Sequence, residues 1–340
     1  MRWDQQTVDR EASPRLPGYR DVTVRHFDAP EAVDTRFYEV QAKSILNRVP
    51  EASQMPFRWT VNPYRGCTHA CTYCFARPTH EFLGLGAGRD FEREIVVKVN
   101  APERLRAELG RSRWQREHVA LGTNTDPYQW VEGRYELMRG IWEALRDARN
   151  PCSVLTKSPL LLRDLDLMRE LSAVTDFSAA LSIPTLDQKA WRATEPRSPN
   201  PKARVDAVAE LARAGIKTGV LVAPLMPGIN DSAEQVREVV RLATEAGADY
   251  ITGIALHLRR GVREVFMEWL EEQRPELVPR YESIYRRGAY MPVTERRRLT
   301  QLLEGPLMPP RERFSRVIRA DREAPTARRA RPEPAQSRLF

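Results

Sequence analysis

Residues 62–77 read NPYRGCTHACTYCFAR, and three of the four cysteines of the chain fall inside this stretch. Cys67, Cys71 and Cys74 form a C-x3-C-x2-C pattern, and clustered thiolates of this kind are the usual ligands of iron–sulfur clusters. One loop can wrap three corners of an iron–sulfur cube, which leaves the fourth iron open to an external ligand. Gly66, just before the first cysteine, lets the backbone approach the cluster closely. The stretch therefore predicts a [4Fe–4S] site with one open iron.

A structural zinc ion is the alternative for the same cysteines. Zinc takes four tetrahedral ligands, and His69 or His80 could supply the fourth. Zinc modules usually pair two short ligand turns across a gap, and the sequence contains no second pair. A disulfide framework is not indicated, because the remaining cysteine, Cys152, stands alone. The pattern favours an iron–sulfur cluster over zinc.

The composition bounds the class of protein. The chain has 340 residues, of which 41% are hydrophobic, and it contains no run of 18 apolar residues that would predict a membrane span. Its first residues, MRWDQQTVDREASPR, are charged and lack the apolar stretch of a secretory signal, so we expect a cytoplasmic location. The formal net charge of +8 permits an anionic partner such as DNA.

From about residue 56 onward, short β-rich runs alternate with helix-like runs. Amphipathic spacing predicts helices at residues 134–149, 201–214 and 232–246, and Gly215 and Gly247 follow the last two. Strands are predicted at residues 58–64, 118–124, 152–157, 177–183, 216–223 and 250–256. This alternation favours parallel βαβ units with right-handed crossovers. We therefore predict an α/β fold, a partial (β/α)6 barrel with its chemistry at the C-terminal ends of the strands.

Extensions flank the predicted barrel on both sides. Residues 1–55 are polar and irregular, and we expect an N-terminal extension that packs on the barrel or stays partly loose. The core is expected at 56–260, followed by a C-terminal helical segment at 261–308. Residues 309–340 are rich in Pro, Arg and Ala, and this composition predicts a disordered basic tail.

The cysteine stretch, with Tyr73 before its last cysteine, resembles the signature of the radical S-adenosylmethionine superfamily. The surrounding residues are similar to the branch that includes spore photoproduct lyase and relatives labelled "DNA repair photolyase". Further similar stretches follow in the order of the family, within about residues 56–260; they are GTNTDPYQ (122–129), TKS (156–158), LSIPTLD (181–187), EPRSPNPKAR (195–204) and VLVAPLMPGIND (220–231). The resemblance implies the radical SAM type of partial barrel, with a [4Fe–4S] cluster and S-adenosylmethionine as cofactors and an electron donor such as flavodoxin or ferredoxin.

The resemblance also implies an S-adenosylmethionine site. The segment after the second strand is expected to meet the methionyl amino group, a lysine after the third strand to line the site, and a serine ending the fourth strand to lie near the ribose or carboxylate. Backbone of the fifth strand is expected against the adenine, and two aromatic residues beside the cluster. The residues concerned are Thr123, Thr125, Asp126, Lys157, Ser182, Val222, Pro224, Tyr73 and Phe75. For Lys157 an ordinary strand-end cation is the alternative, and for Ser182 a turn hydroxyl.

The implied activity is reductive cleavage of S-adenosylmethionine to a 5′-deoxyadenosyl radical that abstracts hydrogen from a substrate, for which nucleic acid is one candidate. Spore photoproduct lyase has a hydrogen-donor cysteine after its second strand, where this chain has Thr123 or Asn124, and no other catalytic residue is assigned. Cys152 begins the third strand, at the end away from the cluster, and we interpret it as a core residue. The alternatives are a nucleic-acid-binding protein with a structural cluster and a non-catalytic electron-transfer protein.

The C-terminus reads QSRLF, which resembles the short peptide by which bacterial repair and replication proteins bind the sliding clamp. Leu339 and Phe340 would be two apolar anchors in a preformed pocket, and Gln336 would fix the register. The Pro/Arg-rich residues before this peptide would act as a tether. A sliding clamp is therefore a predicted partner.

Overall fold

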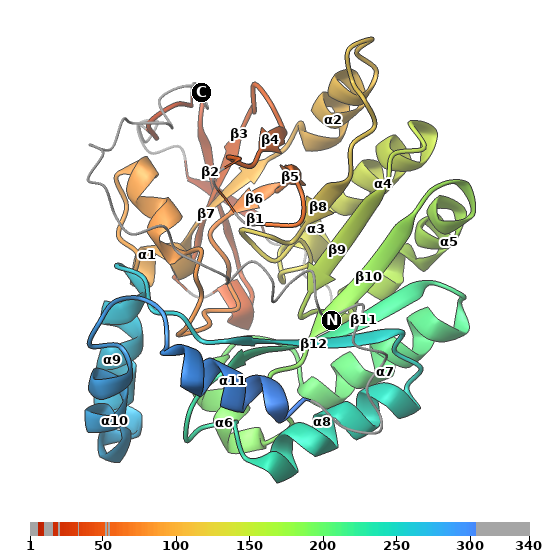
Figure 1. Cartoon of the computed structure of the whole chain (residues 1–340). Helices are drawn as coiled ribbons and strands as arrows, with labels where there is room; N and C mark the ends of the chain where they lie inside the picture. Colours follow the sequence, from red (N-terminus) through yellow and green to blue (C-terminus); the bar gives the residue numbers. More distant parts are fainter. Residues whose placement is uncertain are drawn as a thin grey trace.

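A computed structural model describes residues 6–9, 16–19, 21–32, 34–51, 53 and 55–303. Within these residues, one curved sheet contains six parallel strands that pair in chain order, and an antiparallel strand, β4, extends it beside β5 (Figure 1). The strands are β4 (Leu46–Arg48), β5 (Trp59–Val61), β8 (Val119–Leu121), β9 (Cys152–Thr156), β10 (Phe177–Ser182), β11 (Lys217–Leu225) and β12 (Tyr250–Ala255). The predicted α/β partial barrel is confirmed.

Helices cover the outer face of this sheet (Figure 1). They are α2 (Ala101–Leu109), α4 (Leu137–Asp147), α5 (Leu165–Val174), α7 (Pro201–Arg213) and α8 (Ala233–Glu245). The short elements α3 (Glu132–Tyr135), η3 (Pro159–Asp164) and α6 (Gln188–Thr194) follow β8, β9 and β10 in turn. The start of α7 shows why the sequence predicted it: the side chain of Asn200 accepts a hydrogen bond from the Lys202 amide at 2.8 Å. Gly215 follows the helix with φ at +74°. Local capping signals thus set the ends of this helix.

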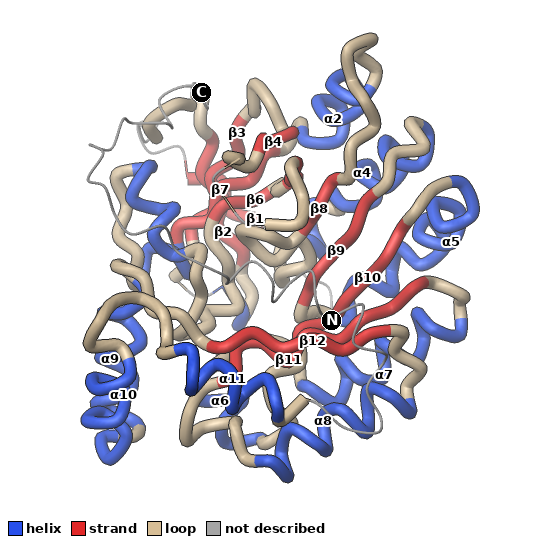
Figure 2. The backbone as a smooth tube through the Cα atoms, in the orientation of Figure 1, coloured by secondary structure: helices blue, strands red, loops and turns tan. Residues whose placement is uncertain are grey.

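The N-terminal extension differs from the sequence prediction, because much of it is ordered sheet. In the described residues, β1 (Gln6–Asp9), β2 (Thr23–Phe27), β3 (Arg36–Val40), β7 (Glu94–Lys98) and β6 (Tyr64–Arg65) form a second sheet in that order, and Figure 2 shows it beside the barrel strands. The rings of Phe27 and Phe37 pack edge to face with their centres 5.1 Å apart, and the ring centre of Trp130 lies 5.8 Å from that of Phe27. The extension therefore packs on the barrel through an aromatic cluster that the polar composition concealed.

The second sheet leads directly into the cysteine stretch. β6 pairs with β7, and Gly66 and Cys67 follow β6 without a break. β7 in turn pairs in parallel with β3 of the extension, from Arg36 opposite Glu94 to Val40 opposite Lys98. The first part of the chain therefore helps to fix the segment that carries the cysteines.

The remaining elements lie on either side of the site. A 3-10 helix, η2 (Arg77–Leu83), and α1 (Arg89–Arg93) follow the cysteines, and η1 (Pro30–Ala32) lies in the extension. After β12 the described chain is helical; the elements are α9 (Val262–Gln273), η4 (Pro275–Leu277), α10 (Val278–Ile284) and α11 (Val293–Gln301). No helix in the described part is long and apolar enough to cross a membrane. The predicted tail and its clamp peptide lie outside the described residues.

We expect Gly122→Ala to disrupt the sheet. Gly122 follows β8 with φ at +79°, and a Cβ there would lie 1.8 Å from the carbonyl oxygen of Leu155 in β9. Because backbone must move to admit the methyl group, the free energy of unfolding should fall by about 3 kcal/mol or more, a loss typical of strained or overpacked sites. Denaturant unfolding followed by circular dichroism measures it.

Gly215→Ala is the matched control. Its φ is +74°, but a Cβ at this position would have no heavy atom within 4 Å. The free energy of unfolding of this variant should fall only by the cost of a left-handed alanine, about 1–2 kcal/mol. Equal losses in the two variants would contradict the close approach of β8 to β9.

Candidate active site

The cysteines lie on one tight loop at the C-terminal end of β5. Cys67 and Cys71 are buried, each 7% exposed, and Cys74 is half-buried. Backbone hydrogen bonds from Ala70 to Cys67 and from Cys74 to Cys71, both 3.3 Å, curl the loop, and the Cys67 amide donates to the Phe91 carbonyl at 3.0 Å. The loop therefore places the three thiols at the mouth of the barrel.

Polar side chains from the β8–α3 segment support this loop. The Gly66 carbonyl accepts from the Thr125 hydroxyl at 2.6 Å and from the Gln129 amide at 3.3 Å, and the Gln129 side-chain oxygen accepts from the Thr68 amide at 2.9 Å. Thr125 was predicted to meet the methionyl amino group of S-adenosylmethionine. In the structure its hydroxyl donates to the loop backbone, and its contact with the cofactor stays a prediction.

A buried arginine closes the loop from the other side. The Arg77 guanidinium donates to the Cys71 carbonyl at 2.9 Å and to the Gly88 carbonyl at 2.9 Å, and it pairs with Glu92 at 2.5 Å. Only 1% of Arg77 is exposed. Sequence reasoning missed this residue, although it ends the quoted stretch, because an arginine after a cysteine motif gives no sign of being buried.

The loop fits an iron–sulfur cluster by its donor set and its free hydroxyls. The Thr68 and Thr72 hydroxyls are buried beside the cysteines, and neither has a hydrogen-bond partner among the described residues. A Cβ on Gly66 would lie 2.9 Å from each of three neighbouring groups, so only glycine fits there. Within the residues that the structure describes, no three Cys, His, Asp or Glu side chains are arranged to hold a single metal ion. The fit to an iron–sulfur cluster therefore rests on the shape of the loop and on its cysteine and threonine side chains.

Burial also sets the protonation of the thiols. It raises the pKa of all three cysteines above the usual range, and that of Cys71 to about 12. Thiols in such a site favour the protonated form until a metal supplies positive charge, because the ligand of iron is the thiolate. The chemistry of the donors is thus that of a metal-dependent site.

Asp126 connects the cysteine loop with the ends of β8 and β9. Its carboxylate accepts from the Lys157 amide at 2.7 Å and the Thr156 hydroxyl at 2.6 Å, and it lies 3.3 Å from His69 in the loop. Burial alone would raise the pKa of Asp126, but His69 and these hydrogen bonds lower it to about 2. The sequence placed Asp126 at the site, and the structure gives it a supporting position there.

A second buried carboxylate, Glu195, connects the loop with β9 and α7. The Tyr73 hydroxyl donates to Glu195, and the Arg204 guanidinium pairs with it at 2.5 Å. Arg204 and Glu195 are 0% and 1% exposed. Although burial would raise the pKa of Glu195, the neighbouring Arg204 and Lys157 lower it to about 2. Sequence reasoning missed the roles of Glu195 and Arg204, even though they are the two ends of the stretch EPRSPNPKAR.

Lys157 and Ser182 meet beside this pair. The Lys157 ammonium lies 3.1 Å from the Ser182 hydroxyl, 3.8 Å from Glu195, and 5.7 Å from the ring centre of Tyr73. Ser182 in turn donates to the carbonyl of Ala223 at 3.2 Å. The predicted residues Tyr73, Lys157 and Ser182 therefore lie together, next to the loop.

The other predicted cofactor residues lie around this centre. Val222 is fully buried in β11, and Thr123 and Pro224 are half-buried at the ends of their strands. Phe75 is 52% exposed, and its ring centre lies 6.3 Å from that of His257, just after β12. Phe75 is thus next to the loop, whereas Thr123 follows β8 and Val222 and Pro224 lie in β11.

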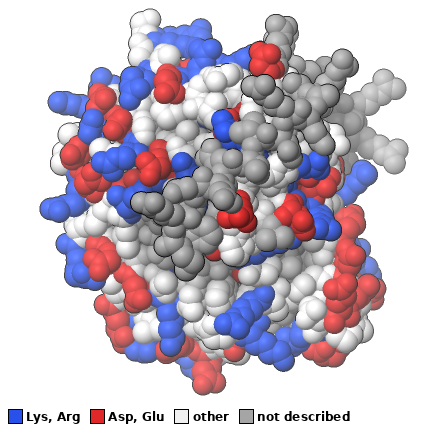
Figure 3. Space-filling view, turned by 180° about the vertical axis from the view of Figure 1, so that it is seen from behind, with Lys and Arg blue, Asp and Glu red and all other residues white. Residues whose placement is uncertain are grey.

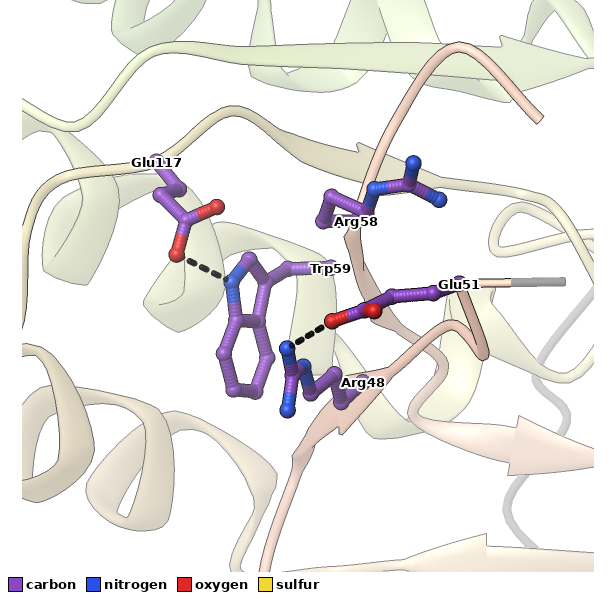
Figure 4. A pocket seen from close by; sticks show the side chains of 5 residues that line it. All are labelled: Arg48, Glu51, Arg58, Trp59 and Glu117. Carbon is purple, nitrogen blue, oxygen red and sulfur yellow. Dashed lines mark hydrogen bonds and ion pairs between the residues drawn. The ribbon is translucent and has the colours of Figure 1, made fainter. Parts of the chain in front are cut away.

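Two features lie at the opposite end of the barrel. Cys152 is fully buried at the start of β9. A pocket of about 490 Å³ opens near the start of β5, where Trp59 donates to Glu117 at 2.9 Å and Arg48 to Glu51 at 2.8 Å (Figure 4). Since the cysteines follow the other end of β5, this pocket is separate from the candidate site.

The Radical SAM superfamily model matches residues 61–243, more than half of the chain. The chain belongs to the radical SAM superfamily. This radical SAM protein is 44% identical to an uncharacterized protein of Mycobacterium tuberculosis over 351 residues, which covers 100% of both chains. It is 28% identical to a radical SAM Nα-GlyT isomerase of Pseudomonas phage M6 over 170 residues, 49% of this chain and 33% of that protein.

A solved structure shares the fold of this radical SAM protein. Spore photoproduct lyase in complex with dinucleoside spore photoproduct superposes with a TM-score of 0.55 at 17% identity, covering 78% of this chain and 77% of that one. Membership in the superfamily makes the protein a radical SAM enzyme, with a [4Fe–4S] cluster and S-adenosylmethionine as its cofactors.

We expect Glu195→Ala to lower the free energy of unfolding by about 3–5 kcal/mol, because it leaves Arg204 and Lys157 as buried cations without their carboxylate. Glu195→Gln keeps the shape of the side chain and should retain the hydrogen bond from the Tyr73 hydroxyl, so its free energy of unfolding should fall less. Denaturant unfolding of anaerobic protein, followed by circular dichroism, compares the two variants.

Glu210→Ala serves as the control, since Glu210 pairs with Arg213 at 2.7 Å on the exposed surface of α7. Exposed pairs contribute little, so the unfolding midpoint should stay almost unchanged. If Glu210→Ala lowered the free energy of unfolding as much as Glu195→Ala, burial of Glu195 would not explain the effect of its loss.

Proposed function

We propose that Cys67, Cys71 and Cys74 hold a [4Fe–4S] cluster with which the enzyme cleaves S-adenosylmethionine reductively. With one electron from an external donor such as flavodoxin or ferredoxin, the bound groups would supply cleavage of the C5′–S bond to methionine and a 5′-deoxyadenosyl radical, which would take a hydrogen atom from the substrate and leave a substrate radical. The observation that carries the proposal is three thiols on one loop, two buried and one half-buried, beside Lys157 and Ser182.

The charges around Lys157 support a binding site for the methionyl carboxylate. Lys157 and Arg204 supply two cations close to Glu195, and Arg204 already forms the shorter pair with it, 2.5 Å against 3.8 Å. Lys157 can therefore turn to a second carboxylate without leaving Glu195 uncompensated. Ser182 accepts a hydrogen bond from the same ammonium at 3.1 Å and so holds it beside this position.

The strand ends favour an enzyme over the two alternatives. An electron carrier or a structural cluster needs only the cysteine loop, whereas Tyr73, Lys157 and Ser182 converge beside it on three different segments. The enzyme does not have a cysteine in the loop where spore photoproduct lyase has its hydrogen donor, and Cys152 is buried at the far end of the barrel. We therefore propose hydrogen abstraction without a cysteine relay; the cytoplasmic location and the sliding clamp as partner stay predictions.

Replacing Cys67, Cys71 and Cys74 together with Ala should abolish the cluster. Anaerobically reconstituted parent protein should carry about four irons per chain and absorb broadly near 400 nm, and the variant should show neither. Cys152→Ala is the control and should keep both, because that thiol lies at the other end of β9. Stoichiometric zinc without iron in anaerobically purified parent would disprove the cluster.

Lys157→Met and Ser182→Ala should each weaken S-adenosylmethionine binding about tenfold or more while leaving the iron content unchanged, since a hydrogen bond to a charged group is lost. With dithionite, the parent should release 5′-deoxyadenosine, which chromatography quantifies, and both variants should require more cofactor. Lys217→Met, at the exposed start of β11, is the control and should behave as the parent. An intact, reducible cluster that never binds or cleaves the cofactor would rule out the proposal.

A further inference from the structure

The C-terminal helical segment brings one edge of the molecule next to the cysteine loop. His257 forms a β-bridge with Tyr290, and the Leu258 amide donates to the Ala289 carbonyl at 2.8 Å. The turn after β12 also touches the segment that follows the cysteines, because a Cβ on Gly261 would lie 3.1 Å from Pro78. Figure 1 shows α9 and α10 beside α1 at this edge.

Aromatic rings form a row along this edge. Phe75, which follows Cys74 directly, and Tyr290 are each 52% exposed, and His257 lies between them. The His257 ring stacks on Tyr290 at 5.7 Å and lies 6.3 Å from Phe75. Two large aromatic side chains half open to solvent beside the site are available to stack on a planar ligand.

Arginines also flank the row. Arg259, Arg260, Arg286 and Arg287 are exposed, and none forms an ion pair with a carboxylate within the described ranges. Arg259 instead donates to the Tyr290 hydroxyl at 2.6 Å and lies 5.7 Å from its ring centre. We call these four arginines, with Phe75, His257 and Tyr290, the edge surface.

Some exposed arginines on the outer helices are paired with acidic neighbours. Arg146 lies 2.6 Å from Glu170, and Arg241 lies 2.7 Å from Glu238. Figure 3 shows the same mixture on the face seen from behind, where Lys and Arg alternate with Asp and Glu. The edge surface combines four arginines that lack such partners among the described residues with exposed aromatic rings, and its charge is complementary to an anionic ligand.

We propose that the edge surface binds a single strand of nucleic acid and holds it at the mouth of the barrel. Arginines contact phosphates, and exposed aromatic rings stack on bases, whose faces are accessible in a single strand and covered in a duplex. An acidic peptide would match the charge but would leave the exposed rings without a partner. The proposal gives the substrate class of the proposed function and rests on it for the chemistry, whereas binding itself is measured separately.

The test is fluorescence anisotropy with a fluorescein-labelled 20-nucleotide single strand, as DNA and as RNA, and the matching duplex, titrated with reconstituted full-length enzyme. The four-fold variant Arg259→Ala, Arg260→Ala, Arg286→Ala, Arg287→Ala should bind the single strand at least about tenfold more weakly and lower the log–log salt slope by about three. Tyr290→Ala should weaken single-strand binding about tenfold and duplex binding much less. Iron content and circular dichroism verify that the variants fold.

A control with the same loss of charge replaces paired arginines: Arg139→Ala, Arg146→Ala, Arg213→Ala, Arg241→Ala. It should bind within about twofold of the parent, because these side chains already have acidic partners. Equal weakening in both four-fold variants, or unchanged binding in the edge variant, would overturn the proposal, since net charge or the C-terminal tail would then account for binding. Displacement of the oligonucleotide by a polyglutamate peptide at equal charge concentration would overturn it in favour of an acidic peptide.

The two proposals fail in different ways. Release of 5′-deoxyadenosine by the parent protein tests the chemistry and needs no nucleic acid. A parent that binds the single strand through the edge surface but never cleaves S-adenosylmethionine would refute the proposed function alone. A parent that cleaves the cofactor, with an edge variant that binds as the parent does, would refute the edge surface alone.

Discussion

Two buried carboxylates hold the cysteine loop in place, and the geometry of the site depends on them. The loop has few backbone hydrogen bonds of its own, and three of its residues are thiols that burial keeps from ionising. Asp126 connects it through His69 to β9, and Glu195 connects it through Tyr73 to α7. A buried carboxylate is costly unless its partners are fixed, so these contacts specify one position for the loop.

The second sheet completes this support from the opposite direction. β6 leads into Gly66, and β7 pairs both with β6 and with β3 of the N-terminal extension. Glu94, at the start of β7, is buried and accepts from Arg36 at 2.6 Å and from Tyr38 at 2.6 Å. The extension is therefore part of the framework of the site, and loosening it would displace the first cysteine together with β6.

The barrel was predictable because its signals are local. The six parallel strands are short apolar runs, and Asn200 and Gly215 mark the ends of α7 within a few residues. The second sheet was missed because β3 pairs with β7 across a separation of 58 residues, which no local pattern records. For the same reason the local pattern indicated the cysteines, and the family resemblance pointed to Lys157 and Ser182. Neither indicated the roles of Arg77, Glu195 and Gln129, whose importance comes from what they contact after folding.

The residues proposed for the cofactor and the residues of the edge surface follow different strands of the barrel. The residues proposed for the cofactor follow β8, β9 and β10, whereas the edge surface follows β12 and includes the bridge from the helical segment. Phe75 belongs to both sets, because it follows Cys74 and faces His257. A carbon radical must react with its substrate before it meets water or protein, which requires the substrate to cover the mouth of the barrel. A strand held along the edge surface would lie over the residues after Cys74, the one segment that both sets of residues share.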